Sequence, residues 1–210
     1  MTRINRNIIL LFATRITRLF AYGFLSIMLV LYLAQAGLSN MQIGLLLTCT
    51  LIGDAVITLW LTTSADRIGR RRMLIVGALL MVLAGIVFML TKNFAFLIIA
   101  AIIGVISPSG NEIGPFLSIE QASLAELLPD DRRTQVFAWY NLVGSFATAL
   151  GSLCGGWATQ LLQGNGLAPF QAYQVILLGY AAAGGIIALL FLFVSPAVET
   201  KTVPEGPQLR

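Results

Sequence analysis

The feature that most constrains this chain is a series of six apolar stretches, each long enough to cross the hydrocarbon core of a bilayer. One helical crossing needs about 20 residues. We expect a transmembrane bundle over residues 7–195, with a cytoplasmic segment over 1–6 and a cytoplasmic tail or linker over 196–210. The six expected helices cover residues 7–35, 40–64, 73–91, 94–119, 134–163 and 169–194. The predicted fold class is an all-α, polytopic membrane protein.

Charge is scarce throughout the chain. Hydrophobic residues make up 58% and charged residues 10% of the sequence, whereas a soluble domain carries about 25% charged residues. There is no histidine, the commonest metal ligand, so we expect no metal site and no cofactor. Cys49 and Cys154 fall within apolar stretches and are expected to be small packing residues.

The basic residues gather on one side of the predicted membrane. Ten of the thirteen lysines and arginines fall in the terminal segments and in the loops after the second and fourth stretches, whereas Lys92 lies in an opposite loop. By the positive-inside rule, this bias predicts a multi-pass protein of the cell membrane (inner or plasma) with both termini cytoplasmic. Membrane orientation therefore accounts for the net charge of +4, and no nucleic-acid partner is expected.

The loop between the second and third stretches, residues 65–72, reads ADRIGRRR. It resembles the signature loop of the major facilitator superfamily, G-x-x-x-D-R-x-G-R-R/K-R/K. The matching residues are Asp66, Arg67, Gly69, Arg70 and Arg71, while Thr62 stands where the family has its leading glycine. A plain basic anchor at the membrane surface is the alternative interpretation. An acid, an arginine and a glycine at this spacing favour the family.

The resemblance implies the amino-terminal half of a twelve-helix carrier, built from two inverted three-helix repeats. The first and fourth helices would line the central path. A second six-helix half, as a separate chain or a second copy, would complete the carrier; a truncated product is a further alternative. The resemblance also implies a conformational latch, in which Asp66 and Arg70 tie the two halves together in the outward-facing state. Glu120 and Glu126 are candidate partners for the loop arginines within this half.

The fifth stretch carries glycines that resemble the family's antiporter motif, a glycine-rich run ending G-P-x-x-G-G. Ser152 replaces the proline of that motif. The alternative is close helix packing through small residues four positions apart, which needs no transport role. The two interpretations are compatible. The glycines in question are Gly144, Gly151, Gly155 and Gly156.

Ionisable residues inside the stretches mark the expected solute and ion site, because each is costly within a membrane. Arg15, Arg18 and Tyr22 recur at helical spacing and can share one face of the first helix. Asp54 lies at depth in the second stretch. The alternative is that arginines and acids neutralise one another in buried structural pairs.

The fourth stretch is interrupted by SPSGNEIGP over residues 107–115. Two prolines and two glycines predict a kink or a local unwinding. Interrupted helices often line transporter sites, so Asn111 and Glu112 join the candidate site. We expect Asp54 or Glu112 to bind the coupling proton; a kink needed for packing alone is the alternative.

Together these features predict secondary active transport of a small solute by alternating access, coupled to a proton or another ion. The arginines of the first stretch point to an anionic solute, whereas the glycine-rich fifth stretch points to drug-type efflux. No phosphate-binding loop and no nucleophile–base pair is present in the sequence, so an enzyme is not expected. A non-transporting membrane subunit, such as a receptor-like or degenerate half-carrier, is the alternative.

Overall fold

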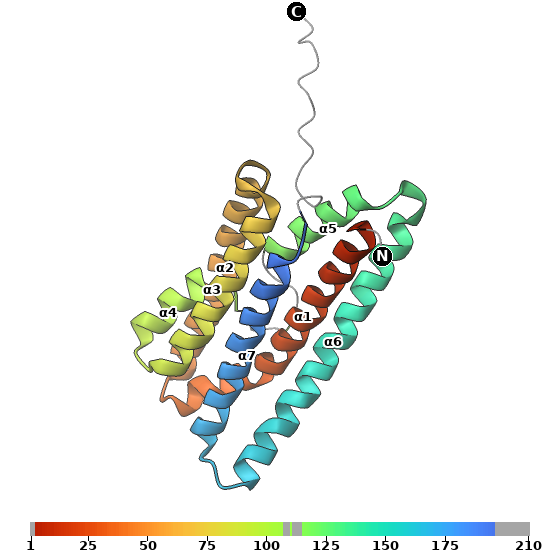
Figure 1. Ribbon diagram of the computed structural model, residues 1–210. Helices are drawn as coiled ribbons and strands as arrows, with labels where there is room; N and C mark the ends of the chain where they lie inside the picture. Colours follow the sequence, from red (N-terminus) through yellow and green to blue (C-terminus); the bar gives the residue numbers. More distant parts are fainter. Residues whose placement is uncertain (1–2, 107–109, 111–114, 196–210) are drawn as a thin grey trace, which may run out of the picture.

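The computed structural model describes residues 3–106, 110 and 115–195, apart from the side chains of residues 3–5 and 66. Within this part of the chain the regular structure is entirely helical (Figure 1). The helices are α1 (Arg3–Gln35), α2 (Asn40–Ile68), α3 (Arg70–Leu90), α4 (Phe94–Ile103), α5 (Pro115–Leu127), α6 (Asp130–Gly164) and α7 (Pro169–Leu192).

Five of these helices are long and apolar enough to cross a membrane, namely α1, α2, α3, α6 and α7. The described chain is therefore an all-α membrane protein with five candidate spans, rather than the six expected from the sequence. The break between α4 and α5 falls in the fourth stretch, for which the sequence predicts a kink or a local unwinding. The predicted fourth helix is split into α4, of 10 residues, and α5, of 13 residues. Each piece is shorter than the roughly 20 residues that one crossing requires.

The backbone chemistry of the segment explains this split. α4 ends at Ile103, because the next residue, Gly104, has an extended conformation (φ −80°, ψ 146°) that cannot continue a helix. Gly110 has a φ of +70°, in the left-handed region that glycine tolerates best. α5 then starts at Pro115, because proline is accommodated in the first turn of a helix and not in its interior.

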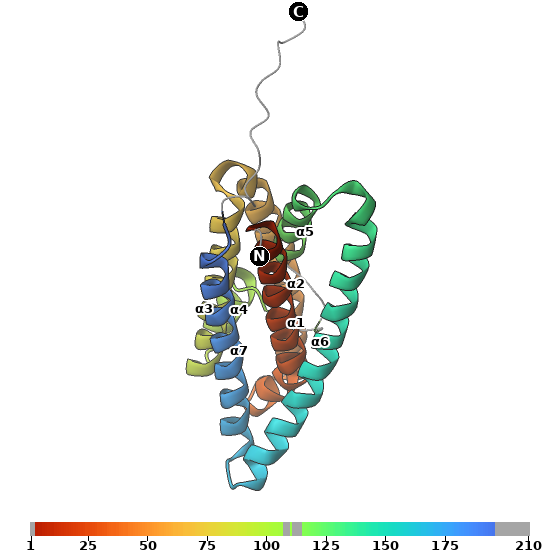
Figure 2. The same ribbon diagram turned by 45° about the vertical axis from the view of Figure 1, so that its right-hand side comes forward.

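α1 is the central helix of the bundle. It packs along α6 on one side and along α7 on another, while α3 packs against α7 and α2 packs against α4. Figures 1 and 2 both show α6 at one edge of the bundle and α4 at the opposite edge. In the most apolar part of α1, 56% of the residues are buried, the highest share among the candidate spans. Polar side chains of α1 are therefore shielded from lipid by its neighbours.

The connections alternate between the two ends of the bundle. The start of α1, the α2–α3 and α5–α6 connections and the end of α7 lie together at the top of Figure 1. Lys92 belongs to the α3–α4 connection at the opposite end. The gathering of arginines at one end follows the sequence pattern, and its cytoplasmic location stays a prediction. We call this end the basic end, because it carries Arg6, Arg67, Arg70, Arg71, Arg72, Arg132 and Arg133.

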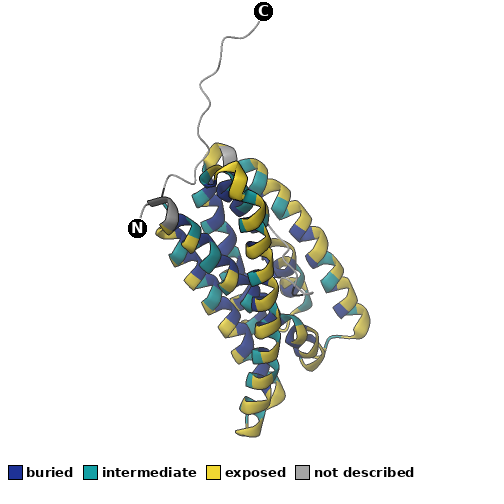
Figure 3. Cartoon of the chain, turned by 90° about the vertical axis from the view of Figure 1, so that its right-hand side faces the viewer, coloured by how far each residue is buried: buried dark blue, intermediate teal, exposed yellow. Residues whose placement is uncertain are grey.

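Apolar side chains cover the outside of the bundle. α2 and α6 are the least enclosed candidate spans, since 28% and 22% of the residues in their most apolar parts are buried. Figure 3 shows exposed residues along the outer faces of the helices and buried residues toward the middle. Such a surface suits lipid or neighbouring membrane helices rather than water. On α6 the exposed side chains include Trp139, Phe146, Leu153 and Trp157.

Two glycines let α6 approach the backbone of α1. A Cβ added at Gly151 would lie 2.1 Å from the carbonyl oxygen of Phe20, and one at Gly155 would lie 2.4 Å from that of Phe24. Both distances are far below any real contact, so neither site admits a side chain without separating the helices. Gly156 differs, because nothing in the described part of the chain lies within 4 Å of a Cβ placed there.

Candidate functional site

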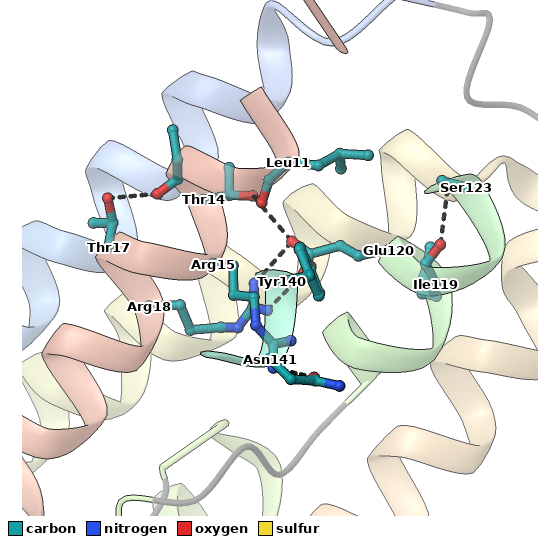
Figure 4. Close-up of polar contacts among 11 residues, drawn as sticks. Leu11, Thr14, Arg15, Thr17, Arg18, Ile119, Glu120, Ser123, Tyr140 and Asn141 are labelled. Atoms are coloured by element: carbon teal, nitrogen blue, oxygen red, sulfur yellow. Dashed lines mark hydrogen bonds and ion pairs between the residues drawn. The ribbon is translucent and has the colours of Figure 1, made fainter. Parts of the chain in front are cut away.

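Glu120 of α5 lies at the centre of a buried polar network that joins three helices (Figure 4). Arg18 of α1 donates through Nη1 to Oε1 at 2.9 Å and through Nη2 to Oε2 at 2.6 Å. Thr14 Oγ1 donates to Oε1 at 3.0 Å, and the Tyr140 hydroxyl of α6 donates to Oε2. Bidentate, charge-assisted hydrogen bonds of this kind are the strong ones. The network therefore holds α1, α5 and α6 together.

The Arg18–Glu120 pair differs from the roles expected of the two residues. The sequence predicts Arg18 as a solute-binding residue and Glu120 as a partner of a loop arginine. In the structure they neutralise each other, with neither side chain exposed, and the Arg18 guanidinium also lies 4.5 Å from the centre of the Phe116 ring. Because α5 begins at Pro115, Glu120 lies inside a helix and faces α1, rather than lying at a helix end near the loop.

Arg15 lies one turn before Arg18 and also contacts α6. Its Nη2 donates to Asn141 Oδ1 at 3.0 Å, and its guanidinium lies 4.0 Å from the centre of the Tyr140 ring. A Cβ at Gly144 would come within 2.7 Å of Arg15 Nε, so this glycine makes room for the arginine. Arg15 is 5% exposed. Arg15 thus contacts Tyr140 directly, and Arg18 is linked to Tyr140 through Glu120 Oε2, to which both donate.

Two loop arginines cross-link the basic end. Arg70 Nη1 of α3 forms an ion pair with Glu126 Oε1 of α5 at 2.9 Å. Arg71 donates from Nε to the carbonyl oxygen of Phe191 at 3.1 Å and from Nη2 to that of Leu192 at 2.6 Å. These carbonyls end α7, where the helix dipole favours a cation. The first turn of α3 therefore contacts α5 and the end of α7 at this end.

The remaining residues of the family-like loop lie as follows. Gly69 joins α2 to α3 with a φ of +114°, a conformation that favours glycine. Arg67 is exposed. Asp66 lies in α2, and its side chain is outside the part of the chain that the structure describes.

Asp54 lies at the midpoint of α2 and is 3% exposed. Neither carboxylate oxygen accepts a hydrogen bond from any described residue. The neighbouring Gly53 meets the end of α4, since a Cβ there would lie 2.4 Å from the backbone of Ile102. A buried ionisable group without such partners is unusual in proteins and calls for an explanation.

Two tyrosines accompany Asp54 in the interior. Tyr22 of α1 and Tyr180 of α7 stack with ring centres 6.3 Å apart. The Tyr180 hydroxyl donates to the carbonyl oxygen of Val105, just after the end of α4. The two tyrosines therefore lie beside the interrupted fourth stretch, whose α4 also meets α2 at Gly53, next to Asp54.

Asn111 and Glu112, which the sequence adds to the site, lie outside the described residues. Gly110, between the undescribed segments, is buried. A Cβ at Gly110 would lie 3.1 Å from Ser26 Oγ of α1 and 3.5 Å from the side chain of Thr148 of α6. The interruption of the fourth stretch therefore contacts α1 and α6 inside the bundle.

Sequence reasoning missed a row of polar side chains on α6: Asn141, Ser145, Thr148 and Ser152. Their spacing of four, three and four residues places them on one helix face. Asn141 and Ser145 are exposed, whereas Ser152 donates to the carbonyl oxygen of Gly23 at 3.2 Å. The signal was present in the sequence, because polar residues at this period within an apolar stretch mark a face turned away from lipid.

The fold and its interior define a class of protein. Helices long enough for a membrane enclose buried arginines, acids and tyrosines beside an interrupted helix, which is the construction of a polytopic membrane transporter. The chain belongs to the Major Facilitator Superfamily, whose family profile matches residues 11–209. Members of this family are transporters rather than enzymes.

Individual relatives support the same assignment. The chain is 40% identical over 197 residues to an uncharacterized membrane protein of Saccharomyces cerevisiae, covering 93% of this chain and 44% of that protein. It is 22% identical over 204 residues to the quinolone resistance protein NorA of Staphylococcus aureus, covering 97% and 48%. The crystal structure of the human organic anion transporter MFSD10 superposes with a TM-score of 0.63 at 19% identity, covering 93% and 48%. The chain thus spans about half the length of these relatives.

Proposed function

We propose that this chain is one half of a secondary active transporter that moves a small solute across the cell membrane by alternating access, coupled to a proton. The observation that carries the proposal is Asp54, a carboxyl buried at the midpoint of a candidate span without a hydrogen-bond partner among the described residues. An ionised carboxyl in such surroundings is strongly disfavoured unless it is paired. Taking up or releasing a proton therefore changes the relative stability of conformations that bury or hydrate it.

The interrupted fourth stretch supports the same proposal. Between α4 and α5 the described residues 104–106 and 110 are not helical, and such backbone is tolerated at membrane depth where it lines a cavity or is enclosed by protein. The Tyr180–Val105 contact and the position of Gly110 beside Ser26 attach this segment to α7 and α1. A movement of the chain between α4 and α5 would therefore change the packing around Asp54.

The cross-links at the basic end fit the role of a conformational latch. Arg70–Glu126 joins α3 to α5, and Arg71 holds the end of α7. We propose that these contacts keep the basic ends of the helices together in one state of the cycle. Asp66 would then extend the latch to the second half of the carrier, as the family resemblance implies.

The second half would cover the least enclosed helices. α2 and α6 expose apolar side chains along most of their length, and the chain spans about half of its relatives. We propose that six further helices, from a separate chain or a second copy, pack on this surface. Native mass spectrometry from mild detergent would test this, because a strict monomer lacking any companion would favour the non-transporting alternative.

For the solute, we propose a small organic molecule, with an organic anion as the first candidate. The relatives' names include a quinolone resistance protein and an organic anion transporter. Arg15 supplies a guanidinium next to the exposed Asn141 at the head of the polar row on α6. A guanidinium beside polar groups is suited to binding a carboxylate.

The test is transport in vesicles that contain the protein as isolated from its own membrane. Norfloxacin, a fluorescent quinolone, and carboxyfluorescein, a fluorescent organic anion, serve as probes under an imposed pH gradient. We expect gradient-driven movement of at least one probe, and its loss in Asp54→Asn. The matched control is Asp130→Asn at the exposed start of α6, which should transport normally. Gradient-driven movement that persists in Asp54→Asn would refute the proposed coupling.

A further inference from the structure

Three consecutive turns of α2 carry buried polar groups without a hydrogen-bond partner among the described residues. These groups are both carboxylate oxygens of Asp54, the hydroxyl of Thr58 and the hydroxyl of Thr62. Their spacing of four residues places them on one face of the helix, about 6 Å apart along its axis. They form a ladder from the midpoint of α2 toward the basic end.

The other threonines of α2 behave differently. Thr48 donates to the carbonyl oxygen of Gly44, Thr50 to that of Leu46, and Thr63 to that of Leu59, at 2.9, 2.8 and 2.7 Å. These are the usual bonds of a hydroxyl to its own helix in an apolar environment. Thr58 and Thr62 have the same option and do not use it, which indicates that their hydroxyls meet another partner.

Water is the partner that fits the geometry. Buried polar groups in proteins are almost always satisfied by protein atoms or by ordered water. Groups about 6 Å apart are too distant for a direct hydrogen bond, but two bonds of about 2.8 Å through one water span that distance. A hydroxyl both donates and accepts, so each threonine can continue a hydrogen-bonded file in either direction.

Water can reach Asp54 along α2 from one end of the helix, because the face of α2 beyond Asp54 carries no further unpaired polar group among the described residues. Toward the opposite end, the Thr50 hydroxyl is occupied by its own helix, and Leu46 and Ile43 are buried apolar side chains. At the level of Asp54 itself, Gly53 is pressed against the backbone of Ile102. Water along α2 would therefore reach Asp54 from the basic end.

Asp54 is the acid near α2 that is available to exchange a proton, because the other described acids around this helix are held in ion pairs. Among described residues, Glu120 is held by Arg18 and Glu126 by Arg70, and Asp54 has no ion pair. α4 carries no titratable side chain. α2 itself also carries Asp66 and Arg67, near its end. The titratable and charged residues on the other helices around it are Arg3, Arg6, Arg15, Arg18, Tyr22 and Tyr32 of α1, Arg70, Arg71 and Arg72 of α3, Glu120 and Glu126 of α5, and Tyr173 and Tyr180 of α7.

We propose that a file of water molecules bound by Thr62 and Thr58 conducts protons between the basic end and Asp54. One proton enters at Thr62, each water and hydroxyl passes one on and receives one back, and one proton arrives on the carboxylate to give the neutral acid. No other bond changes. This inference rests on the proposed role of Asp54 as the coupling group and adds the side from which it is protonated.

The experiment follows the Asp54 carboxyl by infrared difference spectroscopy after a pH jump, on the protein as isolated, in vesicles. The carbonyl band of a protonated carboxyl that disappears in Asp54→Asn reports Asp54. We expect Thr58→Val and Thr62→Val, which keep the side-chain shape, to slow the appearance of this band by about tenfold, the effect of losing one hydrogen bond. Thr63→Val and Thr50→Val are matched controls and should keep the wild-type rate, as should Thr58→Ser, which keeps the hydroxyl.

Each outcome decides between the alternatives. Slowing in the two valine variants, with normal rates in the controls and in Thr58→Ser, supports the file. Unchanged rates in both, together with a raised melting temperature, would mean that the hydroxyls are dry, and the file would be rejected while the coupling role of Asp54 stood. A band that Asp54→Asn does not remove would overturn the file and the proposed coupling together. Should one valine variant not fold, the other and Thr58→Ser still decide.

Discussion

Arg18 of α1 and Glu120 of α5 form a bidentate ion pair with both side chains fully buried. The pair joins residues 102 positions apart in the sequence. Two opposite charges enclosed in this way are held by each other and by Thr14 and Tyr140. Breaking a buried pair from one side leaves an uncompensated charge, which is far more destabilising than removing both charges.

We therefore predict that Glu120→Gln destabilises the protein by about 3–5 kcal/mol. The amide keeps the shape of the carboxyl but removes the negative charge that Glu120 places against the Arg18 guanidinium. The measurement is thermal unfolding of the detergent-solubilised protein. The matched control is the double variant Arg18→Met with Glu120→Gln, which removes both charges and should recover much of the loss. Equal destabilisation of the single and double variants would show that packing, not charge, accounts for the effect.

The Arg70–Glu126 pair at the basic end should behave differently, because Glu126 is partly exposed. We predict that Glu126→Gln changes stability by no more than about 1 kcal/mol, as for other surface-accessible pairs. Since the pair links α3 to α5 at the proposed latch, the same variant should change the rate of probe transport. Asp130→Asn removes the more exposed Asp130–Arg133 pair and should affect neither quantity. A transport rate identical in the two variants would argue against a latch.

The helices and the interruption could be predicted from the sequence because both depend on local properties. Apolar length marks a span, and the prolines and glycines over 107–115 mark the break. What local patterns could not predict is which buried charges meet. Glu120 follows the last apolar residues of its stretch, so it looked like a group at the helix end. Its partner is decided by how α5 packs on α1, which is a long-range property of the fold.

The interior position of Asp54 was predictable in the same way, since an acid within an apolar stretch must be sheltered. The hydroxyl ladder beside it was not. Thr58 and Thr62 are ordinary residues in a membrane helix, and their sequence spacing does not reveal whether each hydroxyl bonds to its own backbone. That distinction depends on the three-dimensional structure, in which Thr63 makes this bond and Thr62 does not.

Gly151 is predicted to be intolerant of any side chain. A Cβ there would lie 2.1 Å from the Phe20 carbonyl oxygen, and backbone cannot move aside as a side chain can. We expect Gly151→Ala to push α6 from α1 and to destabilise the protein by about 1–3 kcal/mol. Gly156→Ala is the control on the same helix, because a Cβ placed there would meet no described atom of another helix within 4 Å. Thermal unfolding measures both, and similar melting temperatures for the two would contradict the close approach of α1 and α6.

Asp54→Asn is predicted to separate stability from function. The carboxylate is buried without a partner among described residues, whereas an amide of the same shape carries no charge to desolvate. We expect the variant to melt a few degrees higher at neutral pH, since about 1 kcal/mol corresponds to roughly 2–4 °C in a protein of this size. Asp130→Asn, at an exposed position, should melt as the parent does. A lower melting temperature for Asp54→Asn would mean that Asp54 is a structural anchor, and its loss of coupled transport could then no longer be ascribed to the missing proton acceptor.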